Sequence, residues 1–118
     1  MAFKVKRVYE DPADSDGERI LVDRLWPRGL KKEKARVDKW LKEIAPSNEL
    51  RTWFAHDPTK WGEFRTRYFH ELDAKGAEPF DSLLEIARTE NVTLLFAARE
   101  QALNNAVALK QYLENRPR

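Results

Sequence analysis

The sequence contains no cysteine, only four glycines and no long apolar run. Without cysteine the chain can form no disulfide and offers no thiol for zinc binding or nucleophilic chemistry. The longest apolar run, residues 94–98, is far too short to cross a bilayer. The first residues alternate apolar and basic side chains and lack the apolar stretch of a signal peptide. These absences predict a cytoplasmic protein that has no membrane partner.

The scarcity of glycine and histidine limits the chemistry further. Four glycines form no glycine-rich phosphate loop, and no serine lies in a nucleophile-elbow pattern. The two histidines, His56 and His70, are too far apart in the sequence to suggest a metal site without help from carboxylates. We therefore expect no metal and no cofactor, and the sequence leaves open whether the protein is an enzyme.

Charge is abundant but nearly balanced, with a formal net charge of +2. Residues 1–42 contain 12 Lys and Arg against 8 Asp and Glu, so the excess of positive charge lies in the first third of the chain. Such an asymmetry is found at anion-binding faces and also on ordinary mixed-charge surfaces. A net charge this small argues against specific binding to duplex DNA.

The apolar pattern predicts three strands, over residues 3–9, 19–25 and 92–98. The last is apolar throughout apart from Thr93, which is typical of a central strand buried on both faces of a parallel sheet. With 118 residues the chain is long enough for one ordinary domain. We expect a single α/β domain over residues 1–118, a compact unit with a small, mostly parallel sheet covered by helices.

Apolar side chains at helical spacing predict the helices. A short helix is expected after Ser47, and Asp57-Pro58 has the composition of a helix start. Four apolar stripes at this spacing indicate longer helices: Val37, Trp40, Leu41 and Ile44; Trp61, Phe64, Tyr68 and Leu72; Phe80, Leu83, Leu84 and Ala87; and Ala102, Ala106, Leu109 and Leu113. One shared core is expected to contain Trp40, Leu41, Phe64, Leu84, Leu94, Phe96 and Leu109.

Two arginine-bearing segments lie at the carboxyl ends of predicted strands, residues 23–29 and residues 97–100. Ligands of open α/β sheets bind beyond the carboxyl ends of the strands. We therefore predict that Arg24, Arg28 and Arg99 converge on an anion, near the start of the last helix around Glu100.

In that interpretation Trp26 stacks on a ring of the ligand. The alternatives are structural: Arg24 can pair with Asp23, Arg99 can pair with Asp57 or Glu100, and Trp26 can belong to the core.

His56 and Asp57 are the candidate catalytic pair, because histidine titrates near neutrality and a carboxylate can orient it. Asp57 also has a structural alternative as a helix cap. Asn104 and Asn105 follow Arg99, and two asparagines inside a helix suggest that one has a specific partner. We assign Asn104 to the ligand pocket, with a bond to a loop carbonyl as the alternative.

Long motifs in the sequence resemble the YeaO-like family, known as domain of unknown function 488. The carriers of the resemblance are Arg7-Val8-Tyr9, the nine-residue block Leu21-Val22-Asp23-Arg24-Leu25-Trp26-Pro27-Arg28-Gly29, Trp40-Leu41-Lys42, Ala45-Pro46-Ser47, Glu49-Leu50-Arg51, Trp53-Phe54, His56-Asp57-Pro58, Leu94-Leu95-Phe96-Ala97-Ala98-Arg99 and Asn104-Asn105-Ala106. The resemblance covers nearly the whole chain and implies a small, mostly bacterial α/β protein without an assigned activity.

The chain departs from this family pattern at two positions. Similar proteins often have histidine where this chain has Leu103, and tyrosine where it has Phe96. If that histidine were catalytic or metal-binding, its absence would remove the activity; otherwise the position is structural. Three functions remain open: a domain that binds a small anionic molecule such as a phosphorylated metabolite, a nucleic-acid-binding module using the basic residues 28–42, and a protein-interaction domain using exposed tryptophan.

Overall fold

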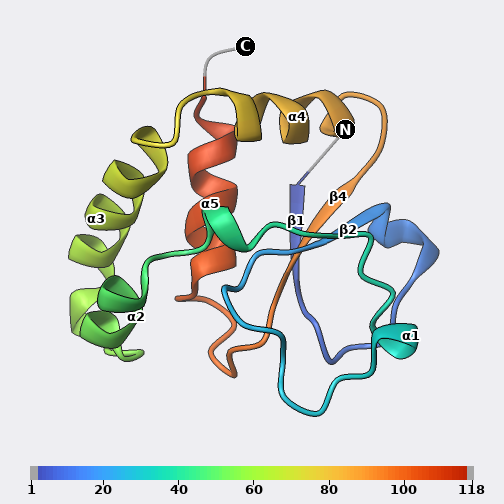
Figure 1. Cartoon of the computed structure of the whole chain (residues 1–118), viewed down its shortest axis with the longest axis horizontal. Helices are drawn as coiled ribbons and strands as arrows, with labels where there is room; N and C mark the ends of the chain where they lie inside the picture. The colour runs from blue at the N-terminus through green and yellow to red at the C-terminus, as the bar shows by residue number, and fades with distance from the viewer. Residues whose placement is uncertain (1–2, 117–118) are drawn as a thin grey trace.

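A four-stranded parallel sheet forms the centre of the protein in a computed structural model, which describes residues 3–116 (Figure 1). The strands stand in the order β1 (Phe3–Arg7), β4 (Val92–Phe96), β2 (Glu18–Leu21) and β3 (Lys39–Trp40). The continuously apolar segment is therefore a central strand, as its pattern predicts. All three pairings are parallel, which confirms the expected α/β fold.

Five α-helices accompany the sheet in the part of the chain that the structure describes. Their bounds are α1, Lys32–Ala35; α2, Asn48–Phe54; α3, Trp61–Asp73; α4, Glu78–Ala87; and α5, Asn105–Glu114. Three short 3-10 helices lie at Asp14–Asp16, Lys42–Ile44 and Pro58–Lys60. Ser47 caps α2 by accepting from the Leu50 amide, and Asp57 caps the third 3-10 helix, as the sequence predicts. No helix within residues 3–116 is long and apolar enough to span a membrane.

The two faces of the sheet bury different clusters, because side chains alternate along a strand. Ile20, Leu94 and Phe96 point into the main core, which α2, α3, α4 and α5 cover. Leu21 and Leu95 point to the opposite face, where the chain between β2 and β3 covers them instead of a long helix. Helices therefore cover one face of the sheet and an extended loop covers the other.

The expected core is correct for six of its seven members, which are Leu41, Phe64, Leu84, Leu94, Phe96 and Leu109. Trp40 is the exception, because it packs with Leu21 and Leu95 on the other face. The helix expected from Val37 to Ile44 is also wrong. That segment contains the two-residue strand β3 and a 3-10 helix, and β3 is a fourth strand that the sequence pattern did not indicate.

The last helix begins later than its apolar stripe indicates. It starts at Asn105, with Asn104 as its cap, so Ala102 lies in the preceding loop and the expected start near Glu100 is wrong. The predicted strands are also shorter than expected, since β1 ends at Arg7, β2 at Leu21 and β4 at Phe96. These early strand ends place the arginine-bearing segments entirely in the loops that follow the strands.

The carboxyl ends of the three longest strands meet at one edge of the sheet. Leu21 of β2 pairs with Leu95 of β4, and Arg7 of β1 pairs with Phe96. The segment after β2 and the segment after β4 therefore start as neighbours, although more than 70 residues separate them in the sequence. This register brings the two motif segments together.

Candidate functional site

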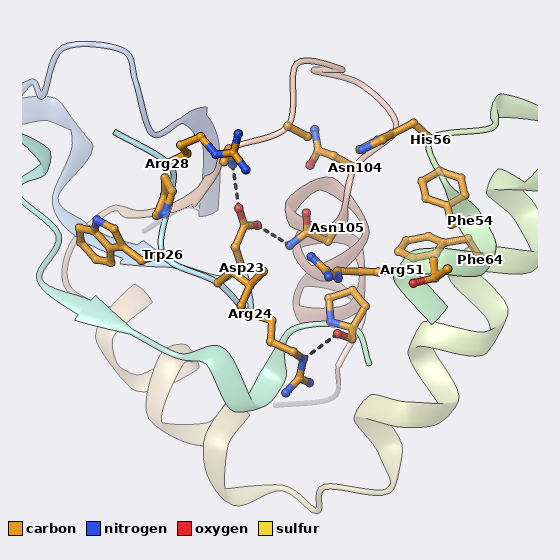
Figure 2. Close-up of a pocket in the computed structure, with 16 residues that line it drawn as sticks. Asp23, Arg24, Trp26, Arg28, Arg51, Phe54, His56, Phe64, Asn104 and Asn105 are labelled. Carbon is orange, nitrogen blue, oxygen red and sulfur yellow. Dashed lines mark hydrogen bonds between the residues drawn. The ribbon is translucent and has the colours of Figure 1, made fainter. Parts of the chain in front are cut away.

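A cavity of about 520 Å³ lies at the carboxyl edge of the sheet (Figure 2). Its volume falls within the range of roughly 300–1,000 Å³ that is typical of small-molecule sites. The walls come from the loop after β2, from α2 and the residues around it, from α3, from the segment between β4 and α5, and from the start of α5. The lining residues are Asp23, Arg24, Leu25, Trp26, Pro27, Arg28, Pro46, Arg51, Thr52, Phe54, His56, Phe64, Ala97, Ala98, Asn104 and Asn105.

Asp23 is the carboxylate of the cavity and is fixed from two sides. One oxygen accepts from the Ala97 amide at 2.9 Å, and the other accepts from the Asn105 side-chain amide at 3.0 Å. Burial raises the pKa of Asp23 above its ordinary value, although these two donors and the nearby Arg51 charge act against the rise. A half-buried carboxyl group with a raised pKa in a cleft is typical of a functional site.

Arg24 takes a structural role at the edge of the cavity. Its guanidinium donates to the backbone carbonyls of Pro46 and Ala45, both at 3.1 Å, and so holds the start of α2 against the loop after β2. The ion pair with Asp23, which the sequence left as an alternative, is not formed among residues 3–116, because Asp23 bonds to Ala97 and Asn105 instead. Arg24 contributes positive charge to the cavity, while two of its five N–H donors hold the backbone.

Arg28 and Arg51 are the lining cations with the most free donors. Within residues 3–116 the Arg28 guanidinium has no hydrogen-bond or ion-pair partner, and the Arg28 carbonyl is anchored by the Tyr9 hydroxyl at 2.8 Å. The Arg51 guanidinium has one long contact of 3.4 Å, to Asn48 on its own helix. Figure 2 shows the Arg51 side chain extending from α2 toward Asn105 and Asp23. Both side chains are exposed and can reorient toward a ligand.

His56 follows α2 and lines the cavity in an unusual backbone conformation. Ala55 and His56 both have positive φ, 46° and 58°, in the left-handed region that residues with a side chain rarely adopt. Asp57 is not a lining residue. Its carboxylate accepts from the amide and hydroxyl of Thr59, and these bonds hold its pKa below the ordinary value. The structure therefore places only His56 of the candidate catalytic pair at the cavity.

Both asparagines at the start of α5 line the cavity, although the sequence assigned only Asn104 to it. Asn104 is buried, and its two polar atoms are used by the Val107 amide and the Glu100 carbonyl. Asn105 is half-buried and donates to both Asp23 and the Val22 carbonyl. The structural alternative, a bond to a loop carbonyl, thus describes Asn104, whereas Asn105 belongs to the polar network of the cavity.

Aromatic side chains form the apolar part of the wall. Phe54 stacks on Phe64 with ring centroids 4.4 Å apart, and Phe64 is almost fully buried. Trp26 also lines the cavity, but its indole N–H donates to the Leu30 carbonyl at 2.8 Å and its ring packs edge-on against Trp40. Trp26 therefore anchors the loop after β2.

Arg99 lies outside the lining of the cavity and is exposed. In the same loop, Glu100 accepts from the amides of Ala102 and Leu103, which lower its pKa. The third arginine of the cavity is therefore Arg51, and not Arg99 as the sequence predicts. The pattern alone did not single out Arg51, because it lies on a short helix whose apolar members, Leu50 and Phe54, carried the helical signal.

The two departures from the family pattern lie outside the cavity wall. Phe96 is buried in the main core, and Leu103 is half-buried in the loop before α5. Neither is a lining residue. Among residues 3–116, no three side chains of His, Cys, Asp or Glu form a cluster suited to a metal ion.

Comparison with known proteins places this chain among relatives of similar length. It is 43% identical to the uncharacterized protein YeaO of Escherichia coli K12, with 98% of this chain and 99% of that protein covered. It is 42% identical to the uncharacterized protein Rv3073c of Mycobacterium tuberculosis H37Rv, with coverage of 96% and 94%. No solved structure matches the chain. Residues 2–117 match the model described as the inactive DUF488-N3 subclade, so the chain belongs to the YeaO-like DUF488 family.

Proposed function

We propose that this protein binds a small anionic molecule in the cavity at the carboxyl edge of the sheet, without catalysing a reaction. The observation that carries the proposal is the charge of the lining: three arginines against one carboxylate, with the guanidinium of Arg28 free of partners among residues 3–116. Arginine presents a rigid fork of donors that matches carboxylate and phosphate groups. An anion is the ligand that these unused donors fit.

The lining supports binding more than catalysis. It contains no serine or cysteine, and the Asp57 carboxylate, which would have to orient His56, is engaged with Thr59. The matching family model is described as an inactive subclade, and we extend that description to this chain. In this proposal His56 contacts the ligand without transferring a proton.

Nucleic-acid binding has less support. The basic residues between 28 and 42 do not share one helix face, since they are divided among a loop, α1, β3 and a 3-10 helix. The interaction surface expected around tryptophan is also covered. Lys60 and Arg67 lie over the Trp53 ring, and Arg65 lies over Trp61. The cavity is the stronger candidate for the site of function.

The proposal is tested by thermal-shift and NMR titrations with inorganic phosphate, propyl phosphate and adenosine 5′-monophosphate. We expect saturable binding whose chemical-shift changes map to the lining residues and which weakens as salt rises. Arg28→Gln and Arg51→Gln should each weaken binding roughly 10- to 100-fold, the effect of losing a hydrogen bond to a charged group.

Arg88→Gln is the matched control, since Arg88 lies between α4 and the amino end of β4 and its side chain makes only an exposed pair with Glu85. This substitution should leave the affinity unchanged. Absence of binding by all three probes, or equal loss in the control, would refute the proposal.

A further inference from the structure

Asp23 gives the cavity a second mode of recognition besides its positive charge. Each of its carboxylate oxygens accepts one hydrogen bond, from the Ala97 amide and from the Asn105 side chain. An ionised carboxylate offers about four acceptor sites. Within residues 3–116 no cation lies within ion-pair distance of it. The remaining acceptor sites are therefore available to a molecule in the cavity.

A carboxylate is a poor component for a site that takes a bare anion. Two negative charges in one cavity repel each other, and the repulsion is strong where water is partly excluded. The two protein donors do not require a charged partner, because a neutral amide oxygen would also accept from them. Burying a charge also has a free-energy cost. A hydrogen-bond donor on the ligand would account for the presence of the Asp23 carboxylate in this cavity.

The positions of the charged groups fit this explanation. Figure 2 shows the Asp23 carboxylate in the middle of the site, with Arg28 and Arg51 reaching the cavity from two different segments. Arg28 follows β2 and Arg51 lies on α2, whereas Asp23 is fixed to α5 through Asn105. The cavity therefore offers cationic donors and an anionic acceptor to the same molecule.

We propose that the ligand carries, besides its anionic group, an N–H or O–H donor that binds to the Asp23 carboxylate. This inference rests on the proposed anion-binding function and narrows its ligand class to anions with a hydrogen-bond donor. Arg28 and Arg51 bind the anionic end. Asp23 selects, among anions, those that bring a donor, because only they compensate its charge.

Three phosphate esters of similar size test the inference. Propyl phosphate ends in a methyl group, 2-hydroxyethyl phosphate in a hydroxyl group and O-phosphoethanolamine in an ammonium group. NMR titration of the wild-type protein should show that the last two bind about tenfold more tightly than propyl phosphate. Equal affinity for the three esters would overturn the inference and leave the proposed function intact. Absence of binding by all three would refute the proposed function itself.

The Asp23→Asn variant should change the affinities for propyl phosphate and O-phosphoethanolamine in opposite directions. Removing the negative charge should strengthen the binding of propyl phosphate and weaken that of O-phosphoethanolamine. Asp81→Asn, at an exposed position on α4, is the matched control and should preserve the wild-type order of affinities. An unchanged preference in Asp23→Asn would overturn the inference.

A measurement on the wild-type protein guards against misfolding of the variant. Carboxyl ¹³C NMR should show that O-phosphoethanolamine lowers the pKa of Asp23 and that propyl phosphate raises it. The other charged and titratable groups of the lining, Arg24 and Arg28 after β2, Arg51 on α2 and His56 after α2, are present in both titrations, so a difference between the two esters reports the terminal group of the ligand. The same direction of shift with both esters would overturn the inference.

Discussion

The side-chain amide of Asn105, the first residue of α5, donates at 3.0 Å to the carboxylate of Asp23, which lies 82 residues earlier (Figure 2). The same amide donates to the Val22 carbonyl at 3.0 Å. One asparagine therefore joins the start of the last helix to the end of β2. It fixes both the outer wall of the cavity and the orientation of its carboxylate.

Replacing Asn105 by alanine should destabilise the fold and shift the titration of Asp23. The half-buried Asp23 carboxylate and the carbonyl of the buried Val22 lose their donor, for which we expect a loss of about 1–3 kcal/mol in the free energy of unfolding. The pKa of Asp23 should rise further, because Asn105 is the donor that lowers it most. Urea denaturation and carboxyl ¹³C NMR measure the two effects.

Asn115→Ala is the control at the other end of α5, where the amide makes only an exposed bond to Gln111. It should change the stability by less than about 0.5 kcal/mol. A drop in the pKa of Asp23 in the Asn105 variant would contradict the assigned contact.

A second carboxylate, Asp16, is predicted to control acid stability. Burial alone would raise the pKa of Asp16, but bonds from the Ala13 amide, Lys6 and Arg19 outweigh it, and the pKa is lowered. A depressed pKa stabilises the fold above the unfolded pKa, near 3.9, and this contribution is lost as pH falls through the lower folded pKa. The free energy of unfolding should therefore fall steeply below about pH 4.

Asp16→Asn should remove part of this acid dependence and lower the stability at neutral pH. The variant leaves the buried Arg19 without its ion-pair partner, which typically costs about 3–5 kcal/mol. Asp14→Asn, an exposed neighbour, is the control. Identical pH profiles for the wild-type protein and Asp16→Asn, from chemical denaturation between pH 3 and pH 7, would contradict this account.

How far the sequence predicts the structure depends on the length of each element. All five residues of β4 are buried, and a strand buried on both faces is long enough here for its apolar sequence to predict a central position. Strand β3 has only two residues, too few to show alternation, and its neighbours have helical spacing by coincidence. The prediction for Trp40 is wrong for the same reason, because Trp40 belongs to β3 and this strand directs its side chain to the face that contains Leu21 and Leu95.

The site was predictable only in part. The strand-end rule locates it, because Asp23 and Ala97 directly follow paired strands. The rule cannot tell which arginines face the cavity. Arg24 and Arg99 lie in the two segments that the rule locates, yet Arg24 binds backbone carbonyls and Arg99 does not line the cavity, whereas Arg51 enters from α2. These orientations depend on helix packing that no local pattern encodes.

Gly17 is predicted to be irreplaceable. Its φ of +65° is strained for any residue with a side chain, and an added Cβ would lie 2.1 Å from the Asn91 carbonyl oxygen. That contact is with backbone, so it cannot be relieved by moving a side chain. Gly17→Ala should therefore reduce the free energy of unfolding by more than about 2 kcal/mol.

The control for Gly17 is Gly62, in the first turn of α3. A Cβ there meets nothing within 4 Å, and alanine favours helix by about 0.8–1.0 kcal/mol in helix interiors. Gly62→Ala should therefore raise the melting temperature. Equal effects of the two substitutions would show that the close approach of Gly17 to Asn91 is wrong.

The left-handed residues after α2 give the last prediction. Ala55 ends α2 at a φ of 46°, with its amide bonded to the Arg51 carbonyl, and its side chain is exposed. This conformation costs a residue with a side chain about 1–2 kcal/mol, whereas glycine adopts it freely and loses about 0.4–1 kcal/mol through unfolded-state entropy. Ala55→Gly should thus stabilise the fold by about 0.5–1 kcal/mol in urea denaturation.

The neighbouring substitution His56→Gly separates strain from function. It relieves the same type of strain, at a φ of 58°, but removes a side chain from the cavity wall and from its contact with Phe54. We expect it to weaken the binding of O-phosphoethanolamine, whereas Ala55→Gly should leave the affinity unchanged because Ala55 does not line the cavity. Strained residues persist where the surrounding structure holds them, commonly at functional sites. If His56→Gly bound as tightly as the wild-type protein, the conformation of this turn would serve only to end α2, and His56 would have no part in recognising the ligand.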